Sequence, residues 1–244
     1  MIYLSGFHAI EERIKSGISC GPLLVAKPGP RAREIVSMAI KLKIPIKQAG
    51  TADLDRLAAD HRGILLEVED LTKNGPDTSL ETFMANLGDR KDALAVVLDE
   101  ITDPHNYGAI LRSCDQFGVD IVISRRRRNA KHAEVIAKTS AGASAWVPTT
   151  DAANLLRAVE ILKEGGFWVY GADMKGEYAW TKDLRGRTAI ILGGEGSGIS
   201  RILRESCDAL IAIPSLGRLD SLNVSVAAGV LLYETQRQRK LKAP

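Results

Sequence analysis

Near-continuous apolar runs recur through the second half of the chain and predict buried strands. The runs cover residues 93–98, 119–123, 167–170, 188–192 and 209–213. Runs of this kind are typical of parallel strands that are covered on both faces. Segments of helical period separate them, and strands that alternate with helices favour an α/β fold with a parallel sheet.

Two of the intervening helices can be bounded from the sequence. One is expected over 109–117 with its stop at Gly118, because glycine readily takes the left-handed conformation that ends a helix. The other is expected over 224–240, directly after a loop that contains Pro, Ser, Gly and Asn. Both helices therefore follow loops that carry polar side chains.

The first part of the chain predicts a smaller α/β unit. Its expected strands are 23–26, 44–46 and 63–68, and its expected helices are 31–42 and 51–59, the second with Thr51 as N-cap. These elements form a small α/β unit of their own. We therefore expect a separate small domain over residues 1–72.

A linker is expected between the two patterns, over residues 73–92. The apolar period fades from Leu71 to Asp92 through a stretch of Thr, Asn, Gly, Pro, Asp and Ser, although a short helix fits 80–87. The larger α/β domain then takes up residues 93–244.

Composition is that of an ordinary globular protein, with 45% hydrophobic and 26% charged residues. The three cysteines (Cys20, Cys114, Cys207) are widely spaced and show no metal-ligand motif, which suits a reducing compartment. No apolar stretch approaches the roughly 18 residues of a membrane span, and the first residues lack the features of a signal peptide. The expected location is the cytoplasm, and no metal is expected.

Positive charge is concentrated rather than abundant. The formal net charge of +3 is too small to indicate a nucleic-acid partner, but four consecutive arginines, Arg125, Arg126, Arg127 and Arg128, follow the strand predicted at 119–123. Such a run is often only a solvated loop. Because phosphates bind clustered guanidinium groups, we favour contact with an RNA backbone.

Three loops that follow predicted strands carry most of the candidate chemistry. They lie within 99–112, 191–198 and 213–225. In an open α/β sheet, ligands bind where the strands end and the loops begin. The three loops therefore predict one composite pocket.

The glycine-rich loop at 193–198 excludes the common nucleotide motifs. Ile199 stands where a dinucleotide fingerprint needs Gly or Ala, and no Gly-Lys-Ser/Thr triplet ends the loop. Glu195 would also repel a pyrophosphate. The loop on its own is equally consistent with a tight turn before a helix.

The polar residues of the other two loops are weak signals when taken singly. Asn106, Ser221 and Asn223 are ordinary helix-capping types, and a lone Arg112 on a helix is usually a solvated charge. His105 is the only histidine near these loops, and no histidine shows metal-ligand spacing. Only the joint pattern is specific.

That joint pattern resembles the three signature motifs of a known family. The motifs are Asn-x-Gly-x-x-x-Arg at 106–112, Gly-Gly-Glu-Gly at 193–196 and Ser-Leu-Asn-Val-Ser-Val-Ala at 221–227. In this order they are similar to those of the SpoU (TrmH-like) RNA ribose 2′-O-methyltransferases of the SPOUT superfamily. The resemblance covers the chain from about residue 93 to its end, and the segments 138–143 and 147–148 also resemble the stretch between the family's motifs.

The front of the chain has a shorter and less specific resemblance. Residues 6–10 (Gly-Phe-His-Ala-Ile) and 61–64 (His-Arg-Gly-Ile) are similar to the ribosomal-protein L30e-like substrate domain of the 23S rRNA guanosine 2′-O-methyltransferase (RlmB-like) branch. The resemblance therefore implies that residues 1–72 bind an RNA substrate, and it favours large-subunit ribosomal RNA.

The resemblance also implies a fold and a cofactor that the sequence pattern does not reveal. The fold is the α/β knot of the superfamily, a parallel sheet with a deep trefoil knot, in an obligate homodimer whose site is completed by the partner subunit. S-adenosylmethionine is the implied cofactor, held mainly by backbone groups. By position, the residues that would bind it are Gly193, Gly194, Gly196, Ile213, Leu222, Gly171 and Ala172.

Roles for the polar residues follow from the same resemblance. Arg112 matches the arginine often described as the base, but a guanidinium is nearly always charged, so we favour a clamp on the phosphate beside the target ribose. Asn106, Ser221 and Asn223 would position ribose and phosphate, and Glu195 would orient its loop or Arg112. Cys114 is expected to pack in the core.

Three other functions stay open on the sequence alone. The chain could methylate transfer RNA with the same chemistry, or it could be a non-catalytic RNA-binding relative, although the complete set of motif residues argues against the latter. A nucleotide-dependent oxidoreductase is less favoured, because the glycine pattern does not fit.

Overall fold

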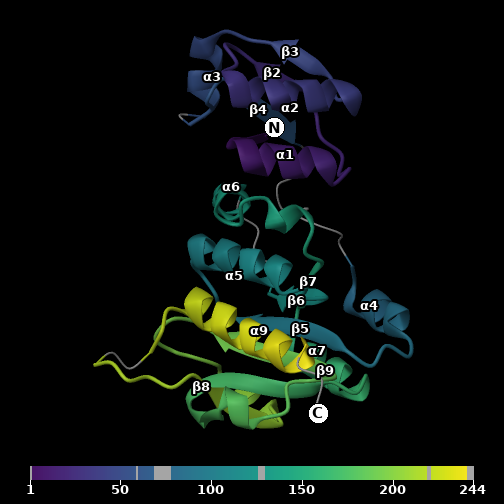
Figure 1. The fold of residues 1–244 in the computed structure, drawn as a ribbon, viewed down its shortest axis with the longest axis vertical. Helices are drawn as coiled ribbons and strands as arrows, with labels where there is room; N and C mark the ends of the chain where they lie inside the picture. Colours follow the sequence, from purple (N-terminus) through teal and green to yellow (C-terminus); the bar gives the residue numbers. More distant parts are fainter. Residues whose placement is uncertain (1, 59, 69–77, 126–129, 219–220, 241–244) are drawn as a thin grey trace. The chain divides into compact units, whose positions relative to one another are not determined.

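Two compact units make up the part of the chain that the computed structural model describes, namely residues 2–58, 60–68, 78–125, 130–218 and 221–240 (Figure 1). The described residues within Met1–Pro76 and Arg128–Trp146 form one unit, and those within Asp77–Arg127 and Val147–Pro244 form the other. Among these described residues, no helix has both the length and the apolar character needed to cross a membrane.

The first unit is built on a four-stranded mixed sheet in the order β1-β4-β2-β3. The strands are β1 (Ile2–Leu4), β2 (Leu23–Val25), β3 (Ile46–Gln48) and β4 (Ile64–Val68), with helices α1 (Phe7–Lys15), α2 (Pro30–Lys41) and α3 (Thr51–Leu57). Strand β4 pairs antiparallel with β1 and β2, while β2 and β3 are parallel. Its apolar core includes the fully buried Ile10, Ile35 and Leu66.

A segment from the second half of the chain belongs to this first unit. It contains helix α6 (Ala130–Thr139) and the 3-10 turn η1 (Ala143–Ala145). Ala137 is buried in the core of the first unit, and the indole Nε1 of Trp146 donates to Glu12 Oε2 at 2.7 Å. A Cβ on Gly142 would lie 2.6 Å from that of Glu12, so only glycine fits there. The predicted domain division did not foresee this association.

The second unit contains the expected parallel sheet, in the order β10-β8-β9-β5-β6-β7 with every neighbouring pair parallel. The strands are β5 (Ala93–Asp99), β6 (Ile121–Ser124), β7 (Thr149–Asp151), β8 (Trp168–Tyr178), β9 (Arg187–Gly193) and β10 (Ala209–Ala212). All seven residues of β5 are buried, as the continuous apolar run predicts for a central strand.

Helices cover both faces of this sheet. They are α4 (Leu80–Leu87), α5 (Pro104–Gln116), α7 (Leu155–Glu164), α8 (Arg201–Ser206) and α9 (Val224–Lys240), with a 3-10 turn η2 (Ala179–Thr181). Ala93, Ala95 and Val97 pack in one core with residues of α4, α7 and α8. Because side chains alternate along a strand, the remaining residues of β5 face the other side. Figure 1 shows α5 and α9 side by side on that face.

Several element boundaries differ from the sequence predictions. Helix α5 begins at Pro104 rather than at 109, because Asp103 Oδ1 accepts the backbone N–H of His105 and proline suits the first turn. Thr51 is not an N-cap: Gly50 takes that position, and its N–H donates to Asp53 Oδ2. Strand β8 continues to Tyr178 instead of ending at 170.

Candidate active site

Strands β5 and β9 bring two of the three candidate loops to one edge of the sheet. They run parallel and in register, with Asp99 opposite Gly193. The loop into α5 follows β5, and the glycine-rich loop into α8 follows β9. The two loops therefore start side by side, as the strand order requires.

The glycine-rich loop closes tightly on itself. The N–H of Gly198 donates to the carbonyl of Gly194 at 3.0 Å, and a Cβ on Gly193 would lie 2.0 Å from the carbonyl carbon of Gly198. A Cβ on Gly194 would lie 2.7 Å from the carbonyl oxygen of Glu100, in the neighbouring loop. The glycines thus allow close backbone packing and leave Glu195 as the first side chain of the turn.

A buried carboxylate fixes the far end of this loop. Asp99 is only 2% exposed, and its Oδ2 accepts the backbone N–H of Ser200 at 2.7 Å. Ser200 is the N-cap of α8. The loop is therefore attached to β5 at its end as well as at its start.

The central feature of the site is a hydrogen-bonded trio of one carboxylate and two amides. Asn106 Nδ2 donates to Glu195 Oε1 at 2.8 Å, and Asn223 Nδ2 donates to the same oxygen at 2.8 Å and to Asn106 Oδ1 at 3.0 Å. The three residues come from α5, the loop after β9 and the residue just before α9. All three predicted loops thus meet, as the sequence pattern predicted.

Further contacts fix the two amides. Asn106 is buried, so its side chain has little room to rotate. Asn223 Oδ1 accepts the backbone N–H of Ser225 at 2.9 Å and the hydroxyl of Ser225 at 2.6 Å, which leaves its Nδ2 to face Glu195. Asn223 therefore serves as a cap for α9 and as a member of the trio at once.

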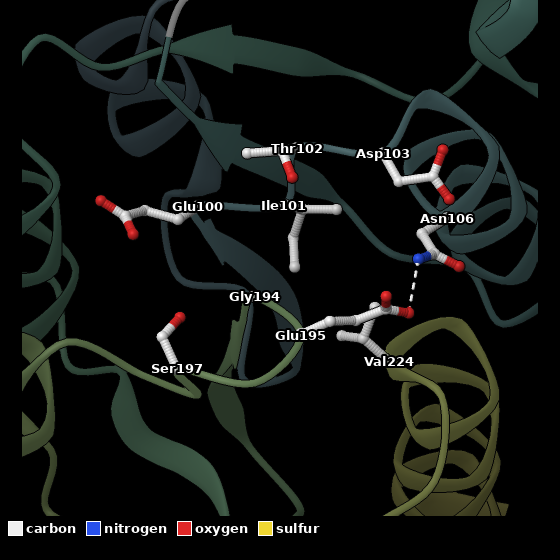
Figure 2. A pocket seen from close by; sticks show the side chains of 9 residues that line it. All are labelled: Glu100, Ile101, Thr102, Asp103, Asn106, Gly194, Glu195, Ser197 and Val224. Atoms are coloured by element: carbon white, nitrogen blue, oxygen red, sulfur yellow. Dashed lines mark hydrogen bonds between the residues drawn. The ribbon is translucent and has the colours of Figure 1, made fainter.

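A cavity of about 160 Å³ lies next to the trio (Figure 2). It is lined by Glu100, Ile101, Thr102, Asp103, Asn106, Gly194, Glu195, Ser197 and Val224. In Figure 2 the side chains of Asn106 and Glu195 point toward one another, while the carboxylate of Glu100 points away from them. The carboxylates make the lining acidic, which suits a ligand that carries hydroxyl groups or positive charge.

The sequence reasoning did not single out several of these lining residues, above all Glu100 and Asp103. Their position could have indicated them, because both lie in the loop that follows β5, the strand with the most continuous apolar run. The backbone of Glu100 has a φ of +56°, which is unusual for a residue with a side chain. The sequence gives no indication of this conformation.

The residues expected to hold the adenosyl group lie in the neighbouring strands β8 and β9 and in the loops after β9 and β10. Gly171 in β8 is in register with Ile191 of β9 and Leu210 of β10, and Ile213 directly follows β10. The β8–β10 register shifts after Leu210, so that the chain departs from the ladder just past Gly171, at Ala172. Of the predicted cofactor residues, only Gly194 lines the cavity beside the trio.

Other predicted residues are not brought to the trio. Arg112 is an exposed residue of α5, and within the described chain no hydrogen bond or ion pair joins it to the trio. Ser221 and Leu222 are exposed in the segment before α9. Arg125 is exposed after β6, and Arg126, Arg127 and Arg128 lie outside the described residues.

The two cysteine thiols of this unit are buried in full or in part. Burial raises the pKa of the Cys114 thiol far above its usual range and that of Cys207 to about 11. Neither thiol therefore supplies a thiolate near neutral pH, and Cys114 packs in the core as expected.

Two family models match this chain. Residues 93–233 match the model of the SpoU rRNA Methylase family, and residues 3–73 match the model described as RNA 2′-O ribose methyltransferase substrate binding. The first match spans more than half of the chain and contains every member of the trio.

Individual relatives cover nearly the whole chain. The 23S rRNA (guanosine-2′-O-)-methyltransferase RlmB of Neisseria meningitidis is 39% identical over 97% of this chain and 95% of that protein. A protein of Borreliella burgdorferi called an uncharacterized tRNA/rRNA methyltransferase is 37% identical over 88% of this chain and 97% of that protein. The AdoMet complex of the SpoU methyltransferase AviRb from Streptomyces viridochromogenes shares the fold, with a TM-score of 0.80 at 24% identity over 99% of this chain and 91% of that one.

Proposed function

This chain belongs to the SpoU rRNA methylase family, and we propose that it methylates the ribose 2′-hydroxyl of a guanosine in 23S ribosomal RNA, with S-adenosylmethionine as methyl donor. The observation that carries the proposal is the trio of Asn106, Glu195 and Asn223. Each member comes from a different signature motif, and two of them, Asn106 and Glu195, line a cavity large enough for part of a nucleotide.

Methyl transfer to a hydroxyl requires an aligned acceptor oxygen and an electrophilic methyl group. The cofactor supplies the methyl when it is bound, so the protein has to align the acceptor, which can contribute several kcal/mol. We assign this alignment to Asn106, Ser221 and Asn223. Arg112 is the proposed clamp on the neighbouring phosphate, because a guanidinium has five donors and no acceptor.

The proposed cofactor site combines positions within β8, at the end of β9 and in the loops after β9 and β10. Gly171, Ala172, Gly193, Gly194, Gly196, Ile213 and Leu222 would hold the adenosyl group. Gly171 itself is packed against the protein, since a Cβ there would lie 2.8 Å from a methyl of Leu210 and 2.9 Å from the sulfur of Cys207. The support for the cofactor site comes from Gly196, where a Cβ would meet nothing within 4 Å, so its backbone is open to a ligand.

The proposed RNA contacts lie in two places. The first unit would bind the RNA substrate as an L30e-like domain, which its match to the substrate-binding model supports. Arg125 to Arg128 would contact the phosphate backbone beside the catalytic site, because they follow a strand that ends at the same edge of the sheet. An enzyme that acts on ribosomal RNA is expected in the cytoplasm.

We propose that the enzyme is a homodimer that forms through its C-terminal unit. Helix α9 exposes Val226, Val230 and Tyr233, which are 51%, 41% and 57% exposed and share one side of the helix. An apolar stripe of this kind is normally covered. Because the stripe starts directly after Asn223, a second copy packed on it would bring its own residues to the site.

The proposed fold of the second unit includes the deep trefoil knot that the family resemblance implies. The order of elements supports it: β10 follows β9 in sequence but pairs with β8, and the chain then returns to α9, which packs against α5. An experimental chain trace from residue 209 to 240 tests whether this segment threads through a loop.

Mapping of ribose methylation tests the proposed reaction. In cells that lack this protein, one 2′-O-methylated guanosine of 23S rRNA is expected to lose its methyl group, and the wild-type gene should restore it. Loss of a methyl group in transfer RNA would indicate the alternative substrate. Unchanged maps of both RNAs would contradict the proposal and favour a non-catalytic relative.

A further inference from the structure

We propose that Oε2 of Glu195 is the atom that accepts the proton of the target hydroxyl. The inference rests on the proposed function and assigns its proton transfer to one oxygen atom. Glu195 thereby becomes a catalytic residue rather than a residue that only orients its loop.

The hydrogen bonds of the trio distinguish the two oxygens of this carboxylate. Oε1 accepts two amide donors, Asn106 Nδ2 and Asn223 Nδ2, each at 2.8 Å. Oε2 has no hydrogen-bond partner among the residues that the structure describes. One oxygen is therefore held by the protein, and the other is available to a ligand in the cavity that Glu195 lines.

The amides cannot easily exchange these roles. Asn106 Oδ1 accepts from Asn223, and Asn223 Oδ1 accepts from Ser225. A flip of either amide would place its oxygen against Glu195 Oε1 and lose donors. The carboxylate is thus presented in one orientation, which a general base requires.

Among the motif side chains, a carboxylate is the group suited to accept this proton. The guanidinium of an arginine is protonated and has only donors, and neutral amides are very weak bases. A carboxylate is too weak to deprotonate a sugar hydroxyl beforehand. It suffices when proton transfer accompanies methyl transfer, because the acceptor oxygen becomes more acidic as its new bond forms.

The step balances without a further reactant. As the acceptor oxygen forms its bond to the methyl carbon, the O–H bond breaks and the proton passes to Glu195 Oε2. The electron pair of the broken carbon–sulfur bond stays on the sulfur, which changes from a sulfonium to a neutral thioether. The protonated Glu195 then returns its proton to solvent.

The variant Glu195→Gln tests this role sharply, because it keeps the oxygen that accepts both amides and replaces the oxygen that would take the proton. We expect its single-turnover methylation rate to fall at least 100-fold, within the usual range for loss of a general base. Binding of S-adenosylmethionine, measured by calorimetry, should change less than threefold. The matched control Glu205→Gln removes an exposed carboxylate of α8 and should keep the wild-type rate.

A second variant covers the case in which glutamine disturbs the loop. Glu195→Ala leaves space for a small acid, so added formate is expected to restore part of its rate and to leave Glu195→Gln unchanged. A Gln variant that stays within threefold of wild type, or an Ala variant that formate does not rescue, would overturn the assignment. An inactive wild-type protein would instead refute the proposed function.

Discussion

Asn106 has two functions at the residue scale, since it donates to Glu195 and accepts from Asn223. Asn106→Asp removes the donor and sets a second negative charge against Glu195. We expect loss of methylation and a decrease of about 1–3 kcal/mol in the free energy of unfolding, measured by urea denaturation. The control is Asn154→Asp, because aspartate replaces asparagine well as the N-cap of α7.

Arg112 lies apart from the trio, and its variant separates cofactor binding from catalysis. Arg112→Ala is expected to abolish detectable methylation while calorimetry still shows binding of S-adenosylmethionine, because an exposed arginine on α5 can reach RNA but is not needed to hold an adenosyl group. If the variant failed to bind the cofactor, the phosphate-clamp role would be wrong.

The sequence predicted that the three loops converge, but it did not predict which of their side chains form hydrogen bonds with one another. Asn106, Glu195 and Asn223 could be brought together because each follows a strand whose place in a parallel sheet is readable from its apolar run. Arg112 stands in the same motif as Asn106, but six residues along a helix correspond to well over one turn, which changes both height and direction. Motif membership alone therefore did not place its side chain.

At the scale of elements, the strands that coincide with long apolar runs were predicted well. The polar continuation of a strand beyond its apolar run was not predicted. Strand β8 continues through Lys175 and Glu177, whose charges gave no strand signal. Pairing with β10 resumes there, opposite Ile211 and Ala212, and this long-range pairing decides the outcome. Helix α9 was bounded correctly because a loop ends and a continuous helical pattern begins at Val224.

The apolar stripe of α9 predicts how the proposed dimer can be separated. Val230→Asp places a charge at the centre of the stripe, so we expect the protein to sediment as a monomer and to lose activity if the partner completes the site. Lys240→Asp adds the same side chain at the exposed end of the helix and should leave the dimer intact. Equal masses for both variants in analytical ultracentrifugation would argue against this interface.

The arginine run predicts a salt effect on RNA binding. Neutralising two charges, in Arg125→Ala/Arg126→Ala, should reduce the slope of log affinity against log salt concentration by about 1.4–1.8. Filter-binding titrations between 50 and 200 mM salt (about the range in which phosphate contacts dominate) measure the slope. An unchanged slope would remove this run from the RNA interface.

At the scale of the whole molecule, cofactor choice can be read from thermal stability. A ligand at about 100 times its dissociation constant stabilises a folded protein by about 2.7 kcal/mol. We expect S-adenosylmethionine and its demethylated product to raise the melting temperature and NAD to leave it unchanged. A rise with NAD would instead support the oxidoreductase alternative, against which the glycine pattern argues.

The division into units was the least predictable feature. Composition indicated the break after the first 70 residues, because turn-forming residues interrupt the apolar period there. Nothing in that pattern linked Trp146 to Glu12, which lie 134 positions apart and meet through one hydrogen bond. Contacts of such separation depend on the folded surfaces of both elements, which a local pattern does not describe.

The packing of α6 and η1 in the first unit limits where the protein can be truncated. A chain shortened to start at residue 77 would still carry α6 and η1 but would lack the core that buries Ala137. The exposed apolar surface of α6 would favour aggregation, even though all six strands of the second unit's sheet would be present. The N-terminal part of this protein is therefore not a domain that can be removed without affecting the rest. An exchange of this unit between relatives has to move residues 1–76 and 128–146 together.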